Sequence, residues 1–287
     1  MKQLKRLLFT AIAVLACCGI CMACYSSKDI KADNTKVKKN VPVGYFSSVE
    51  LTGMPDIRFV QGKKASVSIS GPKSLVESID VTVSGDKLVV TQKSGRNNFW
   101  YSGDNTVTLY VSSPDLTGVS VKGSGCFYMD SNLDTDALGV SVVGSGEAIF
   151  RNVVCDKANF ELRGSGDIKV ESVECRSAEC DLMGSGDMDI KRLKADNAGF
   201  TLKGSGDMDA ALYNVASTTA SVLGSGDIDL SFSNCGDARC EVRGSGDIEL
   251  KGTLGSLSQT CTGTGDIDTE KLNVGHRLQR TATKNHM

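Results

Sequence analysis

The sequence contains little proline, histidine and tryptophan: its 287 residues include 4 prolines, 2 histidines and 1 tryptophan. Both histidines, His276 and His286, lie near the C-terminus, so the body of the chain offers no Cys–His zinc site and no histidine to activate a nucleophile. No nucleophile elbow, phosphate-binding loop or HExxH motif occurs. The formal net charge of −2 provides no basic surface for nucleic acid. We therefore expect neither an enzyme nor a nucleic-acid-binding protein.

Glycine is abundant, with 31 residues, but it does not follow the three-residue period of collagen. The tripeptide Gly-Ser-Gly recurs instead, and a Gly-Thr-Gly variant begins at Gly263. Its seven copies begin at Gly123, Gly144, Gly164, Gly184, Gly204, Gly224 and Gly244. The successive spacings, with the last one counted to Gly263, are 21, 20, 20, 20, 20, 20 and 19 residues. Such regularity identifies a structural repeat.

Each repeat contains two stretches in which apolar and polar residues alternate. With the first glycine as offset zero, apolar residues occupy offsets four and six, then sixteen and eighteen, and offset fourteen is small. Ile168 and Val170, followed by Cys180 and Leu182, illustrate the pattern. A period of two indicates β-strands, and one such unit cannot bury its apolar side alone. The sequence therefore predicts an all-β solenoid with one coil per 20 residues and a glycine at each sharp corner, where a positive φ is needed.

We expect the repeat array to span 118–270, preceded by a strand-rich part at 43–117 and followed by a polar C-terminal tail at 271–287. Within the strand-rich part, residues 94–105 are predicted to form a polar loop. The loop contains Phe99, Trp100 and Tyr101. Exposed aromatic rings can contact a sugar or a partner protein. The alternative is that the loop folds back and its rings cover the open end of the array.

The N-terminus has the features of a targeting segment. Residues 1–23 resemble a bacterial lipoprotein signal peptide, with a basic start and an apolar run too short for a comfortable membrane span. We predict lipid attachment at Cys24, with Cys17 or plain secretory cleavage as alternatives. Residues 24–42 are polar and lysine-rich and are predicted to form a flexible tether. The expected location is the outer membrane, on the periplasmic or the cell-surface side.

The repeats and the segment before them resemble a known bacterial family. The motifs are GSGD and GSGDI, after a start of the type FSSVELTGMPDIRFVQG…VSISGP. Over residues 44–270 the chain is similar to the putative auto-transporter adhesin, head GIN domain family. The resemblance implies a right-handed parallel β-helix in an exported protein, often a lipoprotein, with no established activity. The short chain after Ile267 departs from the family pattern, in which more of a final coil is usual.

Acidic residues recur at offsets three and five of the later repeats. The candidate cation-binding residues are Asp187, Asp189, Asp207, Asp209, Asp227, Asp229, Asp247, Asp266 and Asp268. Like carboxylates one coil apart repel by about 0.9 kcal/mol in bulk water, so some interaction should offset the repulsion. One candidate is Ca²⁺, which prefers oxygen ligands, although no obligatory cofactor is predicted. The alternative is that each offset-three Asp accepts hydrogen bonds from the backbone of its own corner, with Arg163, Lys203 and Arg243 neutralising part of the charge.

Cysteines occupy the same two offsets in two different repeats. Offsets eleven and sixteen hold Cys175 and Cys180 in one repeat, and Cys235 and Cys240 in another. An exported protein can oxidise such pairs. Offset eleven also holds Ala195 and Val215, however, and offset sixteen also holds Phe160 and Phe200, so buried reduced thiols are the favoured interpretation.

These observations predict a non-catalytic exported module for binding or adhesion at the cell envelope, with a glycan or a protein as its partner. One alternative is a self-associating envelope scaffold that pairs through the open ends of the solenoid. A third hypothesis is a carbohydrate-active enzyme. The repeats are uniform and lack the insertions that build a substrate cleft, which argues against catalysis.

Overall fold

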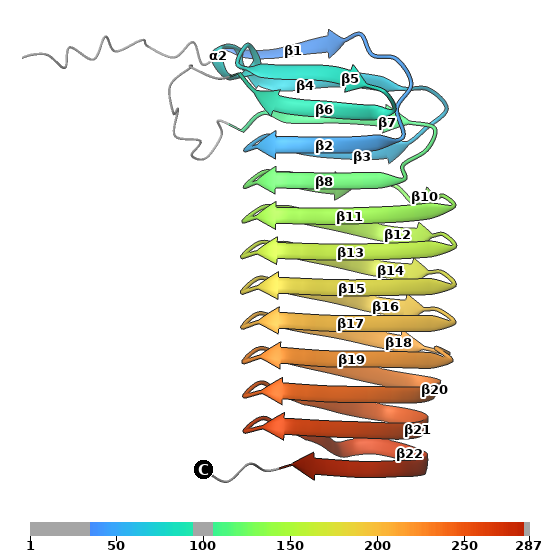
Figure 1. The fold of residues 1–287 in the computed structure, drawn as a ribbon. Helices are drawn as coiled ribbons and strands as arrows, with labels where there is room; N and C mark the ends of the chain where they lie inside the picture. Colours follow the sequence, from blue (N-terminus) through green and yellow to red (C-terminus); the bar gives the residue numbers. More distant parts are fainter. Residues whose placement is uncertain (1–34, 94–105, 284–287) are drawn as a thin grey trace, which may run out of the picture. The chain divides into compact units, whose positions relative to one another are not determined.

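The computed structural model describes residues 35–93 and 106–283, with side chains up to residue 275. It is a parallel β-solenoid of about eight turns with roughly 20 residues per turn. Each coil crosses one sheet, turns at a tight corner and returns across a second sheet (Figure 1). In Figure 1 the front strands point left, the rear strands point right and each coil lies below the last, so the coil is right-handed. The predicted all-β, right-handed solenoid is confirmed.

The regular part of the solenoid consists of two parallel sheets. The strands that lead to the Gly-Ser-Gly corners are β8 (Gly118–Gly123), β11 (Ala137–Gly144), β13 (Lys157–Gly164), β15 (Ser177–Gly184), β17 (Asn197–Gly204) and β19 (Ser217–Gly224). Those that leave the corners are β9 (Cys126–Met129), β12 (Glu147–Val154), β14 (Asp167–Glu174), β16 (Asp187–Lys194) and β18 (Asp207–Tyr213), with the short β10 (Leu133–Asp134) after β9. The last three strands, β20 (Asp227–Gly244), β21 (Ile248–Gly263) and β22 (Ile267–Thr283), continue through the second corner. The register places Gly144, Gly164 and Gly184 directly opposite one another, so like residues stack along the axis.

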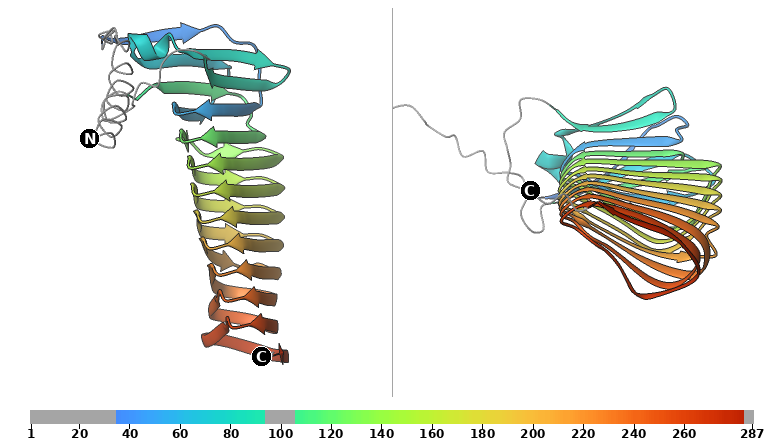
Figure 2. Two further views of the ribbon diagram at one scale, coloured as in Figure 1. Left: turned by 60° about the vertical axis from the view of Figure 1, so that its left-hand side comes forward. Right: turned by 60° about the horizontal axis from the view of Figure 1, so that its bottom comes forward.

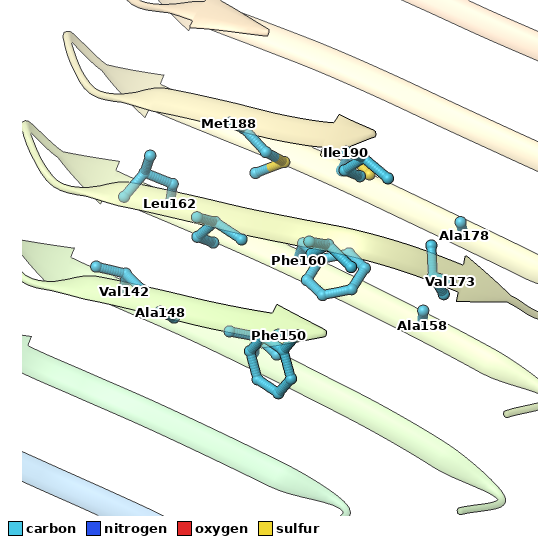
Figure 3. Close-up of a cluster of buried hydrophobic side chains, with 14 of the residues drawn as sticks. Val142, Ala148, Phe150, Ala158, Phe160, Leu162, Val173, Ala178, Met188 and Ile190 are labelled. Atoms are coloured by element: carbon cyan, nitrogen blue, oxygen red, sulfur yellow. The ribbon is translucent and has the colours of Figure 1, made fainter. Parts of the chain in front are cut away.

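The core lies between the two sheets and is filled by the alternating apolar side chains (Figure 3). Its N-terminal half contains a run of phenylalanines: ring centroids are 6.0 Å apart for Phe59 and Phe127 and 5.6 Å apart for Phe127 and Phe150. Phe160 continues the run, 6.4 Å from Phe150. Such pairs add stability beyond the area they bury.

Both glycines of the corner are required by contact between coils. Gly184 has φ +143°, and a Cβ there would lie 2.1 Å from the carbonyl oxygen of Gly164. Gly186 has no positive φ, yet its Cβ would lie 2.0 Å from the carbonyl oxygen of Gly166. The serine between them donates its backbone N–H to the preceding coil, as Ser185 does to Gly164 at 2.9 Å. Backbone conformation explains the first glycine, as predicted, and the stacking of corner on corner explains the second.

The strand-rich part before the array adds two more coils to the same solenoid. β2 (Ser48–Gly53) lies parallel to β8 and places Gly53 opposite Gly123, while β3 (Asp56–Gln61) lies parallel to β9. β6 (Lys87–Gln92) and β7 (Thr108–Ser113) form the next layer, parallel to β2 and β3. The predicted boundary between residues 117 and 118 is therefore not a structural boundary.

Antiparallel strands close the N-terminal end of the solenoid. They are β1 (Lys36–Val41), β4 (Ser66–Pro72) and β5 (Ile79–Ser84), with the short helix α2 (Lys73–Val76) between β4 and β5. β4 pairs with β7, β1 pairs with β4, and β5 pairs with β6. Figure 2 shows this cap at one end of the coils. The predicted flexible tether is thus wrong over residues 36–41, because their backbone groups pair with β4.

The C-terminal tail predicted at 271–287 is also wrong up to residue 283, where β22 ends as a further coil paired with β21. Its polar sequence concealed the coil: Arg277 lies opposite Leu257, and Arg280 lies opposite Gln259. The expectation of a shortened final coil is corrected in the same way. Cys24 and the aromatic residues Phe99, Trp100 and Tyr101 lie outside the described residues, so these predictions remain predictions.

Candidate functional site

The nine predicted acidic residues lie in two columns on the outer surface of one sheet. Offset three stacks Asp187, Asp207 and Asp227 in register. Offset five stacks Asp189, Asp209 and Asp229 in the same way, and Glu249 and Asp268 continue this column. The residues between and beyond them, at offsets four and six, are buried. Strand alternation therefore turns both acidic columns toward solvent.

The C-terminal part of these columns forms a groove of about 920 Å³. Its lining residues are Asp207, Met208, Asp209, Asp227, Asp229, Asp247, Glu249, Asp266, Ile267, Asp268, Thr269 and Glu270. Seven of the nine predicted residues line this groove, while Asp187 and Asp189 lie one coil before it. The predicted site omitted Glu249, which belongs to offset five, and Glu270, which is the last residue of the predicted array.

Burial and mutual repulsion disfavour the ionised form of carboxyl groups in the groove. Burial raises the pKa of the Asp209 carboxyl, and the carboxylates of Asp229 and Asp189 raise it further. Burial likewise raises the pKa of Asp229, with Glu249 as the strongest acidic neighbour. Lys251 opposes both shifts. Each shift means that the ionised form is less stable here than in water, so a cation at this surface would be favourable.

The acidic side chains accept hydrogen bonds from backbone N–H groups of the next coil. The backbone N–H of Asp247 donates to Asp227 Oδ1 at 2.8 Å, and that of Asp266 donates to Asp247 Oδ1 at 2.7 Å. Near the N-terminal end, the Cys126 N–H donates to Asp56 Oδ1 at 3.2 Å. The predicted bond within each residue's own corner is therefore wrong at these positions. Because Cys126 occupies offset three of an ordinary corner, the corner does not require a carboxylate.

The basic residues before the corners do not neutralise the acidic columns in the predicted way. Arg163 pairs with Glu161 in its own strand, with Nε 2.7 Å from Oε1. Arg243 pairs with Glu241 at 2.6 Å. Lys203 is exposed on β17, in register with Met183 and Leu223. These side chains belong to the opposite sheet.

The same surface has a different character toward the N-terminus. Lys169, at offset five, contacts both Glu147 at 2.6 Å and Asp167 at 3.0 Å. These two hydrogen bonds, led by the one to Glu147, raise the pKa of Lys169. Further along, the Arg58 guanidinium lies 5.0 Å from the Tyr128 ring centre. This part of the surface contains both acidic and basic groups, whereas the groove contains mainly carboxylates.

An aromatic and cationic surface at the N-terminal end was not predicted. Besides the Arg58–Tyr128 contact, Lys38 Nζ lies 5.3 Å from the Tyr110 ring centre. Tyr110 and Tyr128 both lie opposite Arg58 in the sheet, so the four side chains form a stack. The repeat pattern could have predicted that Arg58 and Tyr128 are neighbours, because both stand at offset five from a corner glycine. Lys38 joins them through antiparallel pairing, which the repeat pattern does not reveal.

Metal binding remains a prediction. Within residues 35–93 and 106–283, no three His, Cys, Asp or Glu side chains are arranged to hold one ion. Spacing by coils keeps the carboxylates apart, since neighbouring coils are separated by about 4.8 Å. Calcium would therefore have to draw carboxylates of adjacent coils together.

The seven cysteines of the described chain are unbonded in the structure. Cys180 and Cys240 point into the core and are each 1% exposed. Burial raises the pKa of both thiols. Cys175 is not bonded to Cys180, the partner that the oxidised alternative named, but makes a thiol–thiol hydrogen-bonding contact with Cys155 of the preceding coil.

The fold and this surface define a parallel β-solenoid with an acidic outer groove, and comparisons with known proteins identify its family. The model of the putative auto-transporter adhesin, head GIN domain family matches residues 45–233 and 211–286, so the chain belongs to this family. A search of curated proteins found no match. No helix in the described chain is both long and apolar enough to cross a membrane. Membership suggests an exported or cell-surface binding protein.

Solved structures from two Parabacteroides species share the fold. A putative adhesin from Parabacteroides distasonis is 21% identical with a TM-score of 0.73, over 82% of this chain and 97% of that one. A putative adhesin from Parabacteroides merdae is 19% identical with a TM-score of 0.71, over 81% and 95%. A putative lipid binding protein from Parabacteroides distasonis is 21% identical with a TM-score of 0.71, also over 81% and 95%. Each is similar to this chain in fold.

Proposed function

We propose that this protein is a non-catalytic binding module, exported and anchored through Cys24, whose acidic groove binds basic groups on a partner at the cell envelope. The observation that carries the proposal is the acidic groove of about 920 Å³ formed by β18, β20, β21 and β22. Opposite charges on a partner would relieve the repulsion between its stacked carboxylates.

Structural need does not account for the acidic groove. The corner forms equally well with Cys126 or Glu147 at offset three, so aspartate is not a condition for the turn. Burial and neighbouring acids raise the pKa values of Asp209 and Asp229, which shows that their charges oppose folding. Lys271 pairs with Glu249 at 2.9 Å, but carboxylates still predominate along the groove. A feature that costs stability and that the N-terminal coils lack, where Lys169 and Arg58 stand at offset five, fits a binding role.

The lining favours a protein partner over a neutral glycan. Glycans commonly stack on aromatic rings, and the groove lining contains carboxylates with Met208, Ile267 and Thr269 but no aromatic residue. Lysine or arginine side chains of a partner would match it. A glycan partner would instead fit the cation–aromatic stack at Tyr110 and Tyr128, or the predicted loop at residues 94–105.

A lipid ligand, which the name of the putative lipid binding protein from Parabacteroides distasonis suggests for that neighbour, finds less support in this chain. The space between the two sheets is filled by side chains such as Phe150 and Phe160 (Figure 3). The exposed large apolar residues are dispersed over the described surface, from Tyr45 near the cap to Leu223 on β19. A lipid tail would need a contiguous apolar surface.

Self-association by head-to-tail stacking is also disfavoured. β1, β4 and β5 cap the N-terminal end with antiparallel strands, so the parallel edge of β22 has no matching parallel edge at the other end. Charged residues along β22, such as Lys271 and Arg277, are typical of edges that avoid pairing. A scaffold would have to form through side surfaces.

Calorimetric titration of the exported chain with a lysine-rich peptide tests the proposal. The affinity should fall steeply as salt rises, because ion contacts are screened. Asp209→Asn combined with Asp229→Asn should weaken binding by about thirtyfold at low salt, because two lost contacts of about 1 kcal/mol each total about 2 kcal/mol.

The matched control removes the same number of charges outside the groove, one from the corner after β12 and one from β14. Asp156→Asn combined with Glu171→Gln should leave the affinity within about twofold, since both residues lie outside the groove. Equal losses in the two double variants would show an effect of net charge alone and would contradict the proposed site.

A further inference from the structure

Two cysteines stand at the same position in neighbouring coils. Cys155 directly follows β12 and Cys175 directly follows β14, and the last residues of these strands, Val154 and Glu174, lie opposite each other. The Cys155 N–H donates to the Glu174 carbonyl at 3.1 Å, and the Cys175 N–H makes the corresponding bond to Lys194 at 2.9 Å. Their Cα atoms are thus separated by one coil spacing, about 4.8 Å. Disulfides typically need a separation of about 4.4–6.8 Å.

The two side chains face each other at the edge of the core. A hydrogen bond from Cys175 lowers the pKa of the Cys155 thiol, and the same contact raises that of Cys175. A lowered pKa increases the share of thiolate, the form that attacks disulfides. Cys155 is 9% exposed, while Cys175 is half-buried and gives access from solvent.

The other cysteines of the described chain lack this arrangement. Cys180 lies in register between Phe160 and Phe200. Cys240 lies between Ala220 and Gln259.

Cys235 and Cys261 each donate a thiol hydrogen bond to a backbone carbonyl. Cys235 Sγ lies 3.5 Å from the Leu212 oxygen, and Cys261 Sγ lies 3.0 Å from the Gly265 oxygen. Cys235 also occupies offset eleven, but its neighbour in the next coil is Leu254. Cys235 is therefore a matched control at the same corner without a second thiol.

We propose that Cys155 and Cys175 form a disulfide that joins two consecutive coils once the chain meets a disulfide-class oxidant in an oxidising compartment. A thiolate of the pair attacks one sulfur of the oxidant R–S–S–R and expels RS⁻. The second thiol, after losing its proton, attacks the mixed disulfide and expels the other RS⁻. Two protein thiols and one R–S–S–R thus give one protein disulfide and two RSH. The modification is independent of the acidic groove.

Peptide mapping of the full chain after treatment with oxidised glutathione tests this assignment. Trypsin separates all the relevant thiols: Cys155 falls in NVVCDK, Cys175 in VESVECR and Cys180 in the peptide beginning at Ser177. The expected product is NVVCDK joined to VESVECR, with the other described cysteines still open to alkylation after denaturation. Alkylation of both Cys155 and Cys175 in oxidised folded protein, or a link from Cys175 to Cys180, would overturn the proposal.

Single variants separate the disulfide from oxidation in general. Cys155→Ala should abolish the link and leave Cys175 open to alkylation; alanine is accommodated because Ala195 occupies the same column. Cys235→Ala should retain the link in full. Oxidation should raise Tm by about 5 °C or more in the unmodified chain and in Cys235→Ala, because the bond closes a loop of about 20 residues. An equal rise in Cys155→Ala would contradict the assignment.

Discussion

The two halves of one sheet share their corners but differ in the surface that they present. In the N-terminal half, Lys169 joins Glu147 to Asp167, and Arg58 stacks on Tyr128. In the C-terminal half, the same two columns contain mainly carboxylates and line a groove. The Gly-Ser-Gly backbone is the same in both halves, with each corner packed on the one before it.

The comparison distinguishes residues that the coil requires from residues that only determine the chemistry of its surface. The glycines are fixed by contact between coils, because even a methyl group would collide with the preceding backbone. Offsets three and five point to solvent and tolerate cysteine, tyrosine, lysine or aspartate without altering the coil. Substitutions at offsets three and five can therefore give a solenoid a specific binding surface without changing its coils.

The largest predicted effect is loss of the shared corner. Gly186→Ala places a Cβ 2.0 Å from the Gly166 carbonyl oxygen, and the backbone on both sides has little room to move. We expect a loss of about 3 kcal/mol or more in the free energy of unfolding, measured by chemical denaturation. Gly139→Ala is the matched control, because its nearest contact is 4.0 Å away. Similar losses in both variants would refute the stacking explanation.

A smaller effect, of opposite sign, is predicted in the acidic half. Asp209→Asn with Asp229→Asn should raise stability at pH 7 by on the order of 1 kcal/mol, because a repulsion between carboxylates is removed. Both folded-state pKa values are raised, so the folded state binds more protons and stability falls as pH rises above about 4. The gain should accordingly disappear at lower pH, where both carboxyls are protonated. Melting curves across this range provide the check, and a gain that persists in acid would argue against repulsion.

The smallest effect is predicted for removing a basic charge from the N-terminal half of the sheet, where Lys169 pairs with two acidic residues. Lys169→Gln leaves Glu147 and Asp167 adjacent without their shared cation and should cost about 0.5–1 kcal/mol. Because the pair is exposed, salt should reduce the difference. Melting temperatures at low and high salt measure it. A difference that grows with salt would show that Lys169 acts through packing and not through charge.

The repeat made the coil and its two outward columns predictable from the sequence. Elements without the repeat were missed: β1 was assigned to a tether, and β22 to a tail. Residues 36–41 become a strand only because β4 offers an antiparallel edge. Residues 271–283 continue the coil although arginines replace apolar residues, because β21 supplies the pairing.

The candidate site, like the fold, was predicted only where the repeat determines it. The repeat placed the acidic columns, since register follows directly from spacing. It did not show that Asp227 and Asp247 accept bonds from the next coil, because that depends on side-chain direction. Nor did it show the contact between Lys38 and Tyr110, which come from strands far apart in the sequence.

Carboxyl footprinting with a carbodiimide, with and without the lysine-rich peptide, shows whether the acidic groove is the surface that binds a basic partner. Tryptic peptide 204–239 contains four groove aspartates, and peptide 244–251 contains two more groove acids. Peptide 164–169 contains Asp167, which lies outside the groove and pairs with Lys169. We predict that the lysine-rich peptide reduces labelling of 204–239 and 244–251 and leaves 164–169 unchanged. Unchanged labelling of 204–239, or equal protection of 164–169, would contradict it.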